Sequence, residues 1–191
     1  MSKYRIAAAF LVFLMTTFLM ATGICAAQSA ADYQNAINNL DITAIKSLQI
    51  GRPSGGNYPA TFHILVDNKN KDGVRLIKGK FDIEFHDDRS GGDHLNIGEA
   101  KFSGATQDYD FEILGNTLNK NVTLTVSNIP VDKIIRMINI IGDPNNKLRM
   151  TIKGDSEAGL QVARGWVTEK GKKYGIELNW HPQTQREVLM K

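Results

Sequence analysis

Cysteine is nearly absent from this chain of 191 residues, since Cys25 is the only one. A single thiol cannot form an intramolecular disulfide, a zinc site built from several thiolates or a Cys-x-x-Cys redox pair. Cys25 also lies within the first 27 residues, which have the features of a removable leader. A chain without this leader has no thiol nucleophile, and its stability comes from its hydrophobic core.

An excess of one charge is also lacking, because 23 Lys and Arg residues stand against 20 Asp and Glu residues. The first 27 residues hold two of the basic residues and no acidic one, so their removal lowers the net charge from +3 to +1. No long basic run remains, which argues against nucleic acid as a partner. The G-x-S-x-G, H-E-x-x-H and P-loop signatures are missing as well. These absences disfavour an enzyme, so no cofactor is expected and no catalytic, cofactor-binding or metal-binding residue is assigned.

The N-terminal segment has the parts of a secretory signal peptide. Lys3 and Arg5 give it a positive start, and the uncharged stretch over 6–27 that follows is densely apolar at its centre. Small residues end the segment at Ala27. We therefore predict a signal peptide over 1–27 that is cleaved after Ala27, and export to the periplasm or the extracellular space.

Two other roles for this segment stay open. As an uncleaved anchor, the stretch over 6–27 is just long enough to cross a hydrocarbon layer of about 30 Å. As a lipoprotein signal, it would carry a lipid on Cys25, although Ile24 stands where such signals have a small residue. The polar end of the segment favours cleavage over the anchor.

Beyond the leader, apolar and polar residues alternate over short segments that turn residues separate. Period two is clearest over 60–66, 81–85 and 122–126, and it predicts half-buried strands. The segment over 81–85 is part of one strand over 74–85, and further strand-like segments lie at 42–50, 95–102, 109–113, 148–153, 160–168 and 174–180. We place one domain over 40–181, a linker or short helix over 28–39 before it and a polar tail over 182–191 after it.

One segment has helical periodicity instead. Its apolar residues are Val131, Ile134, Ile135, Ile138 and Ile141. Pro130 suits the first turn of a helix, and Gly142-Asp143-Pro144 ends it. The spacing predicts a short helix over about 130–141 that packs its isoleucines on a sheet and turns Lys133 and Arg136 to solvent. Together, the segments predict a mainly β fold, an antiparallel immunoglobulin/fibronectin-like β-sandwich of about seven to eight strands with this one short helix.

The order of these segments resembles a known family, the late embryogenesis abundant (LEA) group 2 proteins, whose module is also called the WHy (water stress and hypersensitive response) domain. The pieces that carry the resemblance are Ile64–Asn70 with its Asn-x-Asn turn, Ile77–Phe85, the glycine-bearing Asn96–Ala100, Val122–Pro130 leading into a helix, and Met150–Gly154. They extend over about residues 40–178. One departure is Lys69, which replaces the proline of the turn while both asparagines remain.

The resemblance implies a β-sandwich and a protein that is not an enzyme. The family is associated with dehydration and other stress, in protective roles or in association with proteins and membranes. It has no accepted catalytic residues, so none is carried over to this chain. The implied partners are unidentified client proteins or a membrane surface.

Two polar segments carry candidate metal ligands. Asn68 to Gly73 begins like an EF-hand loop, but Gly79 stands where the twelfth-position acid is needed, so a hairpin turn is favoured over calcium binding. His86-Asp87-Asp88 and Asp93-His94 lie at the two ends of one predicted turn, where imidazoles and carboxylates can meet around a divalent ion. A solvated loop is the favoured interpretation. Glu84, on the polar side of its strand, is interpreted as part of the wet face.

Three function classes are therefore kept. The leading one is an exported, non-enzymatic binding or protective module of the LEA group 2 type, related to stress such as desiccation. The second is a membrane-proximal adaptor or subunit of a cell-envelope complex. The third is a small hydrolase or metal-dependent enzyme on a sandwich scaffold, which the lack of a convergent polar motif disfavours.

The leader interpretation makes a direct prediction about the protein from its native host. Because Lys3, Arg5 and the apolar stretch that follows have the form of a cleaved signal, the N-terminus should lie at or near Gln28. Intact-mass and N-terminal peptide mass spectrometry measure this. A protein that still begins at Met1 would contradict cleavage and favour the anchor.

Overall fold

The computed structural model describes residues 28–143, 145–163 and 165–182. The chain divides into two compact units, Met1–Ala30 and Ala31–Lys191, and the sheet lies in the second. The described elements are α2 (Ala30–Asn38), β1 (Leu40–Ile50), β2 (Asn57–Asn68), β3 (Val74–Asp87), β4 (His94–Phe102), β5 (Phe111–Ile113), β6 (Thr117–Pro130), α3 (Val131–Gly142), β7 (Leu148–Val162), β8 (Gly165–Thr168) and β9 (Tyr174–Trp180). The predicted leader over 1–27, with the proposed anchor and lipid site, and the tail beyond Pro182 lie outside the described residues.

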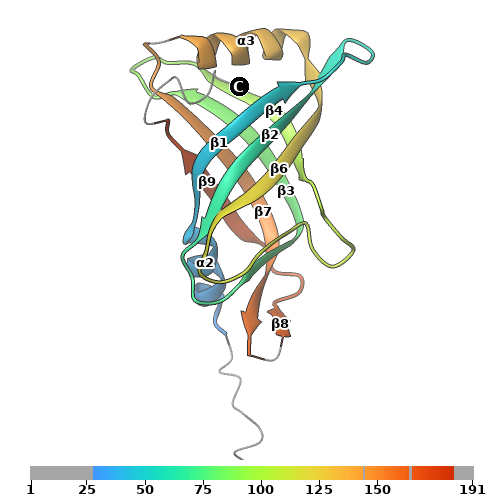
Figure 1. Ribbon diagram of the computed structural model, residues 1–191, viewed down its shortest axis with the longest axis vertical. Helices are drawn as coiled ribbons and strands as arrows, with labels where there is room; N and C mark the ends of the chain where they lie inside the picture. Colours follow the sequence, from blue (N-terminus) through green and yellow to red (C-terminus); the bar gives the residue numbers. More distant parts are fainter. Residues whose placement is uncertain (1–27, 144, 164, 183–191) are drawn as a thin grey trace, which may run out of the picture. The chain divides into compact units, whose positions relative to one another are not determined.

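The nine strands found in the described residues all belong to one antiparallel sheet (Figure 1). Its main path runs β1-β2-β6-β4-β3-β7-β8, while β5 pairs with β3 and β9 pairs with β7. β7 is long enough to pair with β3 along one edge and with both β8 and β9 along the other. The predicted mainly β, antiparallel fold is confirmed.

The sheet curves so that strands distant along its path face each other across the core. β6 and β4 separate β2 from β3 in the strand order, yet the rings of Phe62 on β2 and Phe85 on β3 lie 6.0 Å apart between centroids. Figure 1 shows β1, β2 and β6 in front of β3, β7 and β9. The core therefore lies inside the curve of a single sheet.

This connectivity differs from the predicted sandwich in two ways. The sheet has nine strands rather than seven to eight, and hydrogen bonds join them all instead of leaving two separate sheets. The junction is β4, which pairs with β3 on one side and, through Ala100↔Val126 to Phe102↔Leu124, with β6 on the other. Alternation along single strands predicts which side chains are buried, but it carries no information on this lateral pairing.

A bulge keeps β4 in contact with the core along its length. On β4, Leu95 and Ile97 are buried at odd positions, whereas Ala100 and Phe102 are buried at even ones. The change of phase falls at Gly98, where the register against β3 shifts and φ is +119°. Only glycine adopts this backbone conformation without strain. The extra residue returns the later apolar side chains to the inner face.

The turn between β2 and β3 is organised by a buried asparagine. The Asn68 side chain is fully buried, and its amide nitrogen lies 3.1 Å from the carbonyl oxygen of Asp72 and 3.0 Å from that of Leu114. Its Oδ1 accepts the backbone N–H of Asn70 at 3.0 Å. One side chain thus satisfies polar groups of two loops, as a buried amide must.

The segment between the leader and the sheet, which the sequence leaves as a linker or short helix, is helical from Ala30 to Asn38. Tyr33, Ala36 and Ile37 of this helix, α2, are buried. The Tyr33 ring stacks on Tyr174 of β9 with centroids 5.4 Å apart. These contacts attach α2 to the sheet.

The predicted helix over about 130–141 is present as α3, which begins after Pro130 and ends at Gly142. Its buried side chains are Ile134, Met137, Ile140 and Ile141. The prediction that the isoleucine stripe packs on the sheet was wrong for Ile135 and Ile138, which are 54% and 51% exposed. Apolar residues surround most of this helix, so periodicity alone does not determine which face the sheet covers.

α3 directs its two cations, which the sequence places in solvent, toward the β3–β4 hairpin. Lys133 Nζ donates to the carbonyl oxygen of Asn96 at 2.8 Å, and Arg136 Nη2 lies 2.6 Å from Asp93 Oδ1. Both partners belong to the β3–β4 hairpin or to β4, so the cations hold that flank of α3 against it. Ile135 and Ile138 lie outward because Ile134, Met137 and Ile140 occupy the buried face of the helix. No helix within the described ranges is long and apolar enough to cross a bilayer.

The two faces of α3 make opposite predictions for stability. Met137 is fully buried, so Met137→Ala should lower the free energy of unfolding by about 2–5 kcal/mol. Ile138, one residue further along the helix, is half-exposed, and Ile138→Ala should change it by less than about 0.5 kcal/mol. Urea unfolding followed by circular dichroism measures both. Equal losses in the two variants would contradict the observed rotation of α3.

Candidate functional site

Two histidines from the predicted turn lie opposite each other in the β3–β4 ladder. His86 near the end of β3 pairs in register with His94 at the start of β4. Glu84, two residues before His86, points to the same face of β3 because side chains alternate along a strand. All three side chains therefore lie on the face of the sheet opposite to Ile83, Phe85 and the core.

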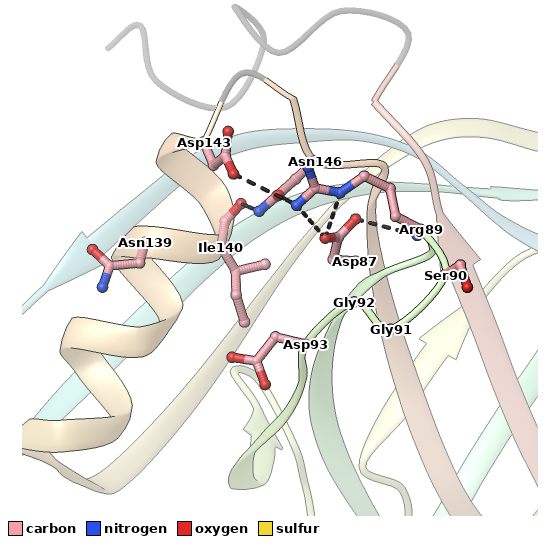
Figure 2. A pocket seen from close by; sticks show the side chains of 10 residues that line it. All are labelled: Asp87, Arg89, Ser90, Gly91, Gly92, Asp93, Asn139, Ile140, Asp143 and Asn146. Carbon is pink, nitrogen blue, oxygen red and sulfur yellow. Dashed lines mark hydrogen bonds and ion pairs between the residues drawn. The ribbon is translucent and has the colours of Figure 1, made fainter.

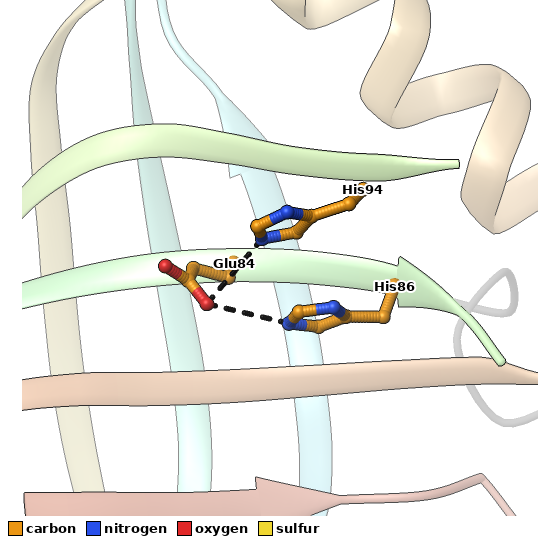
Figure 3. Close-up of side chains that lie close together, drawn as sticks. All are labelled: Glu84, His86 and His94. Carbon is orange, nitrogen blue, oxygen red and sulfur yellow. Dashed lines mark ion pairs between the residues drawn. The ribbon is translucent and has the colours of Figure 1, made fainter. Parts of the chain in front are cut away.

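The three side chains form a compact group (Figure 3). The same carboxylate oxygen, Glu84 Oε2, lies 3.4 Å from His86 Nε2 and 3.4 Å from His94 Nε2. The two imidazole rings are nearly parallel, with centroids 4.3 Å apart. Glu84 and His86 are only 14% and 16% exposed at their side chains, whereas His94 is 57% exposed. Two shielded groups thus share the site with one accessible group.

The surroundings of His86 favour its neutral form. Burial lowers the pKa of His86, and the nearby Arg149 guanidinium and His94 lower it further, against the opposing effect of Glu84 and Asp88. Arg149 is held by two bonds of 2.9 Å to the Asp88 carboxylate. This pairing keeps the pKa of Asp88 below its ordinary value. His86 Nε2 is buried and has no hydrogen-bond partner among the described residues.

The aspartates that the sequence grouped with these histidines have other partners. Asp87 binds Arg89, Asp88 binds Arg149, and Asp93 binds Arg136. Glu84 takes their place beside the imidazoles, although the sequence indicated only a wet face for it. The signal that could have identified it is its spacing, because residues two apart on a strand share a face and a cross-strand pair adds the third group.

A polar hollow of about 430 Å³ lies between the β3–β4 hairpin and the end of α3 (Figure 2). Its lining includes Asp87, Arg89 and Asp93 from the hairpin, with Ile140 and Asp143 from the helix and its end. The Arg89 guanidinium binds the Asp87 carboxylate, approaches that of Asp143 at 3.6 Å and donates to the side chain of Asn146. The Arg89 side chain therefore connects the hairpin to the end of the helix. Because its charge already has these partners, the hollow presents no free cation among the described residues.

Asp87 is the centre of this connection. Its side chain is 3% exposed and lies 2.7 Å from Arg89 Nε. Its Oδ1 also accepts the backbone N–H of Lys147 at 3.0 Å, which ties the loop after α3 to the hairpin. The hydrogen bond from Arg89 is the largest cause that lowers the pKa of Asp87, and the backbone N–H groups of Lys147 and Arg89 lower it further.

No family model matches this sequence, and no curated protein matches it. Solved structures are similar to it at low identity. A crystal structure of a protein from Archaeoglobus fulgidus is 8% identical, with 75% of this chain and 98% of that chain covered and a TM-score of 0.30. The X-ray structure of a Northeast Structural Genomics Consortium target is 12% identical over 81% of this chain and 93% of that one, with a TM-score of 0.32. The solution structure of a candidate LEA protein is 8% identical over 97% and 90%, with a TM-score of 0.27. Likenesses at this level do not define the family of the chain.

The Asp87 network predicts a defined dependence of stability on pH. A carboxylate whose pKa is lowered by folding stabilises the fold above its ordinary pKa of about 3.9 and loses this effect as the pH falls through its lowered value. Asp87→Asn should therefore lower the thermal unfolding midpoint at pH 7, and the gap to wild type should close in acid. Thermal unfolding by circular dichroism from pH 7 down to pH 2 measures this, and the gap should narrow only below about pH 4.

The matched control is Asp93→Asn, which removes the carboxylate of the exposed pair with Arg136. Exposed pairs contribute little, so this variant should remain close to wild type at every pH. A gap for Asp87→Asn that stays constant into acid would show that its effect comes from altered packing and not from charge.

Proposed function

We propose that this chain is an exported, non-enzymatic protective module of the LEA group 2 type, which binds apolar segments of partly unfolded proteins during water loss. The observation that carries the proposal is the exposed apolar face of α3. Val131, Ile135 and Ile138 follow each other at spacings of four and three residues, so they form one continuous stripe on the helix. Each is about half-exposed.

An apolar stripe of this kind is a candidate interaction surface. Exposed large apolar side chains that cluster on one element are uncommon on monomeric proteins, and they mark interaction sites. α3 can present them at low cost because Ile134, Met137 and Ile140 anchor its other face in the core. The helix is thus fixed before any partner binds, which limits the entropy lost on binding.

The charges around the stripe favour protein segments over an anionic membrane. Lys133 and Arg136, the two cations of α3, already contact Asn96 and Asp93. Over the whole chain, 23 basic residues nearly balance 20 acidic ones. Peripheral membrane binding normally combines an apolar face with free basic residues that attract anionic lipid. An apolar stripe without free basic residues beside it is better suited to binding uncharged, apolar protein segments.

The residues that carry the LEA group 2 resemblance support the proposal through their structural roles. Asn68 is the buried hub of the β2–β3 turn, Gly98 has a positive φ at the β4 bulge, and Pro130 ends β6 directly before α3. The positive φ restricts position 98 to glycine, while Asn68 and Pro130 suit their positions through hydrogen bonding and a fixed φ. The resemblance therefore extends to positions where the backbone restricts the choice of side chain.

A drying experiment tests the proposal. Lactate dehydrogenase is dried and rehydrated with the purified protein at equal mass, and its recovered activity is compared with that in serum albumin. The wild-type protein should preserve more activity than albumin does. The double variant Ile135→Lys/Ile138→Lys should lose at least about half of this protection, since lysine replaces apolar contact area. Its thermal unfolding midpoint should stay close to that of wild type, because both positions are half-exposed.

The matched control is Leu114→Lys/Leu118→Lys, which makes the same change at two exposed leucines in and before the start of β6, at the opposite end of that strand from α3. It should keep full protection. Recovery no better than with albumin would overturn the protective function. Equal loss in both double variants would overturn the assignment to α3. Retention of a dye by dried anionic vesicles, without enzyme protection, would show that the partner is a membrane.

A further inference from the structure

We propose that Glu84, His86 and His94 form a binding site for a divalent transition-metal ion of the zinc class. The sequence favoured a solvated loop here and assigned no metal ligand. The fold changes the set of donors by bringing Glu84 between the two imidazoles. This site is independent of the protective function and of the α3 stripe.

The separations between the donor atoms fit a small tetrahedral ion. Zinc binds imidazole nitrogen and carboxylate oxygen at about 2.0–2.2 Å, which places neighbouring ligands of a tetrahedron about 3.3–3.5 Å apart. Glu84 Oε2 lies 3.4 Å from the Nε2 atoms of both His86 and His94. One donor atom from each of the three residues can be chosen so that all lie within 4.8 Å of one another. Three protein ligands leave the fourth position for a water molecule. Solvent can reach this position because His94 is exposed.

His86 gives an independent reason to expect a ligand. Its Nε2 is buried and makes no hydrogen bond among the described residues, although Glu84 Oε2 lies 3.4 Å from it. Such a group normally costs free energy, and buried polar atoms without partners are rare in folded proteins. A metal ion would satisfy this nitrogen directly. Because the two rings are now nearly parallel, binding requires one of them to turn so that both lone pairs converge, and the exposed His94 has room to do so.

The charges that face His86 come from three strands. Glu84 on the same strand contributes a carboxylate, His94 comes from β4, and Arg149 on β7 contributes a cation that Asp88 partly neutralises. Metal binding requires the neutral ring of each histidine. Glu84 then supplies the negative charge that attracts the ion.

The donor types select among metals. Two imidazoles and one carboxylate suit zinc, copper and nickel, whereas calcium and magnesium prefer sites made of oxygen alone. This site differs from the EF-hand-like segment at Asn68–Gly73, where the Asn68 side chain already makes hydrogen bonds within the β2–β3 turn and to Leu114.

Isothermal titration calorimetry with zinc chloride tests the proposal on the purified protein after treatment with a chelator and gel filtration. Wild type should bind one zinc ion per chain with a dissociation constant in the micromolar range or below, and calcium chloride should give no comparable heat. Zinc should also raise the thermal unfolding midpoint, because a ligand that binds the folded state stabilises it.

Three variants decide whether these residues are the ligands. Glu84→Gln keeps the size of the side chain and removes its charge, and His94→Ala removes the exposed imidazole, so each should weaken zinc binding at least about tenfold. His181→Ala is the control, because His181 is exposed and lies 3.6 Å from Asp88, not from Glu84. Circular dichroism confirms that each variant is folded. Absence of zinc binding by wild type would overturn the site. So would zinc binding by Glu84→Gln and His94→Ala that is as tight as binding by wild type.

Discussion

Packing of apolar side chains inside one curved antiparallel sheet is the interaction on which the rest of this structure depends. No cysteine occurs after Cys25, so no disulfide supports the domain. The rings of Phe62 and Phe85, from strands that are not neighbours in the sheet, meet across its interior. The bulge at Gly98 preserves this arrangement, because it returns β4 to the phase in which Ala100 and Phe102 face inward. Without this bulge, the apolar side chains of β4 after Gly98 would face water.

The polar features of the molecule are consequences of this packing. Once Ile83 and Phe85 face the core, Glu84 and His86 must lie on the other face of β3, where pairing with β4 adds His94. α3 packs against this sheet through one face and leaves the stripe that contains Ile135 and Ile138 in solvent. The buried carboxylate of Asp87 then connects the hairpin to the loop after α3. The candidate metal site and the candidate contact surface therefore depend on the same core, although they are chemically unrelated.

Sequence reasoning reached the features that short segments determine. Period-two alternation and turn residues identified strands such as β2, and Pro130 with Gly142 identified the helix. It failed where distant segments decide. The rotation of α3 depends on which of its apolar side chains the sheet covers, and its cations contact Asn96 and Asp93, which lie about 40 residues earlier in the chain. The carboxylate beside the two histidines depends equally on cross-strand register, and the joining of all strands into one sheet depends on the pairing of β4 with β6.

The most direct test of this account is a nuclear Overhauser spectrum of the aromatic side chains in the folded protein. With ring centroids 6.0 Å apart, Phe62 and Phe85 should show cross-peaks between their ring protons, although β6 and β4 separate their strands in the sheet. These cross-peaks would establish that the sheet curves around a single core. Cross-peaks from each ring to its adjacent strands alone would contradict the curved sheet, together with the positions of the histidines and of α3 that depend on it.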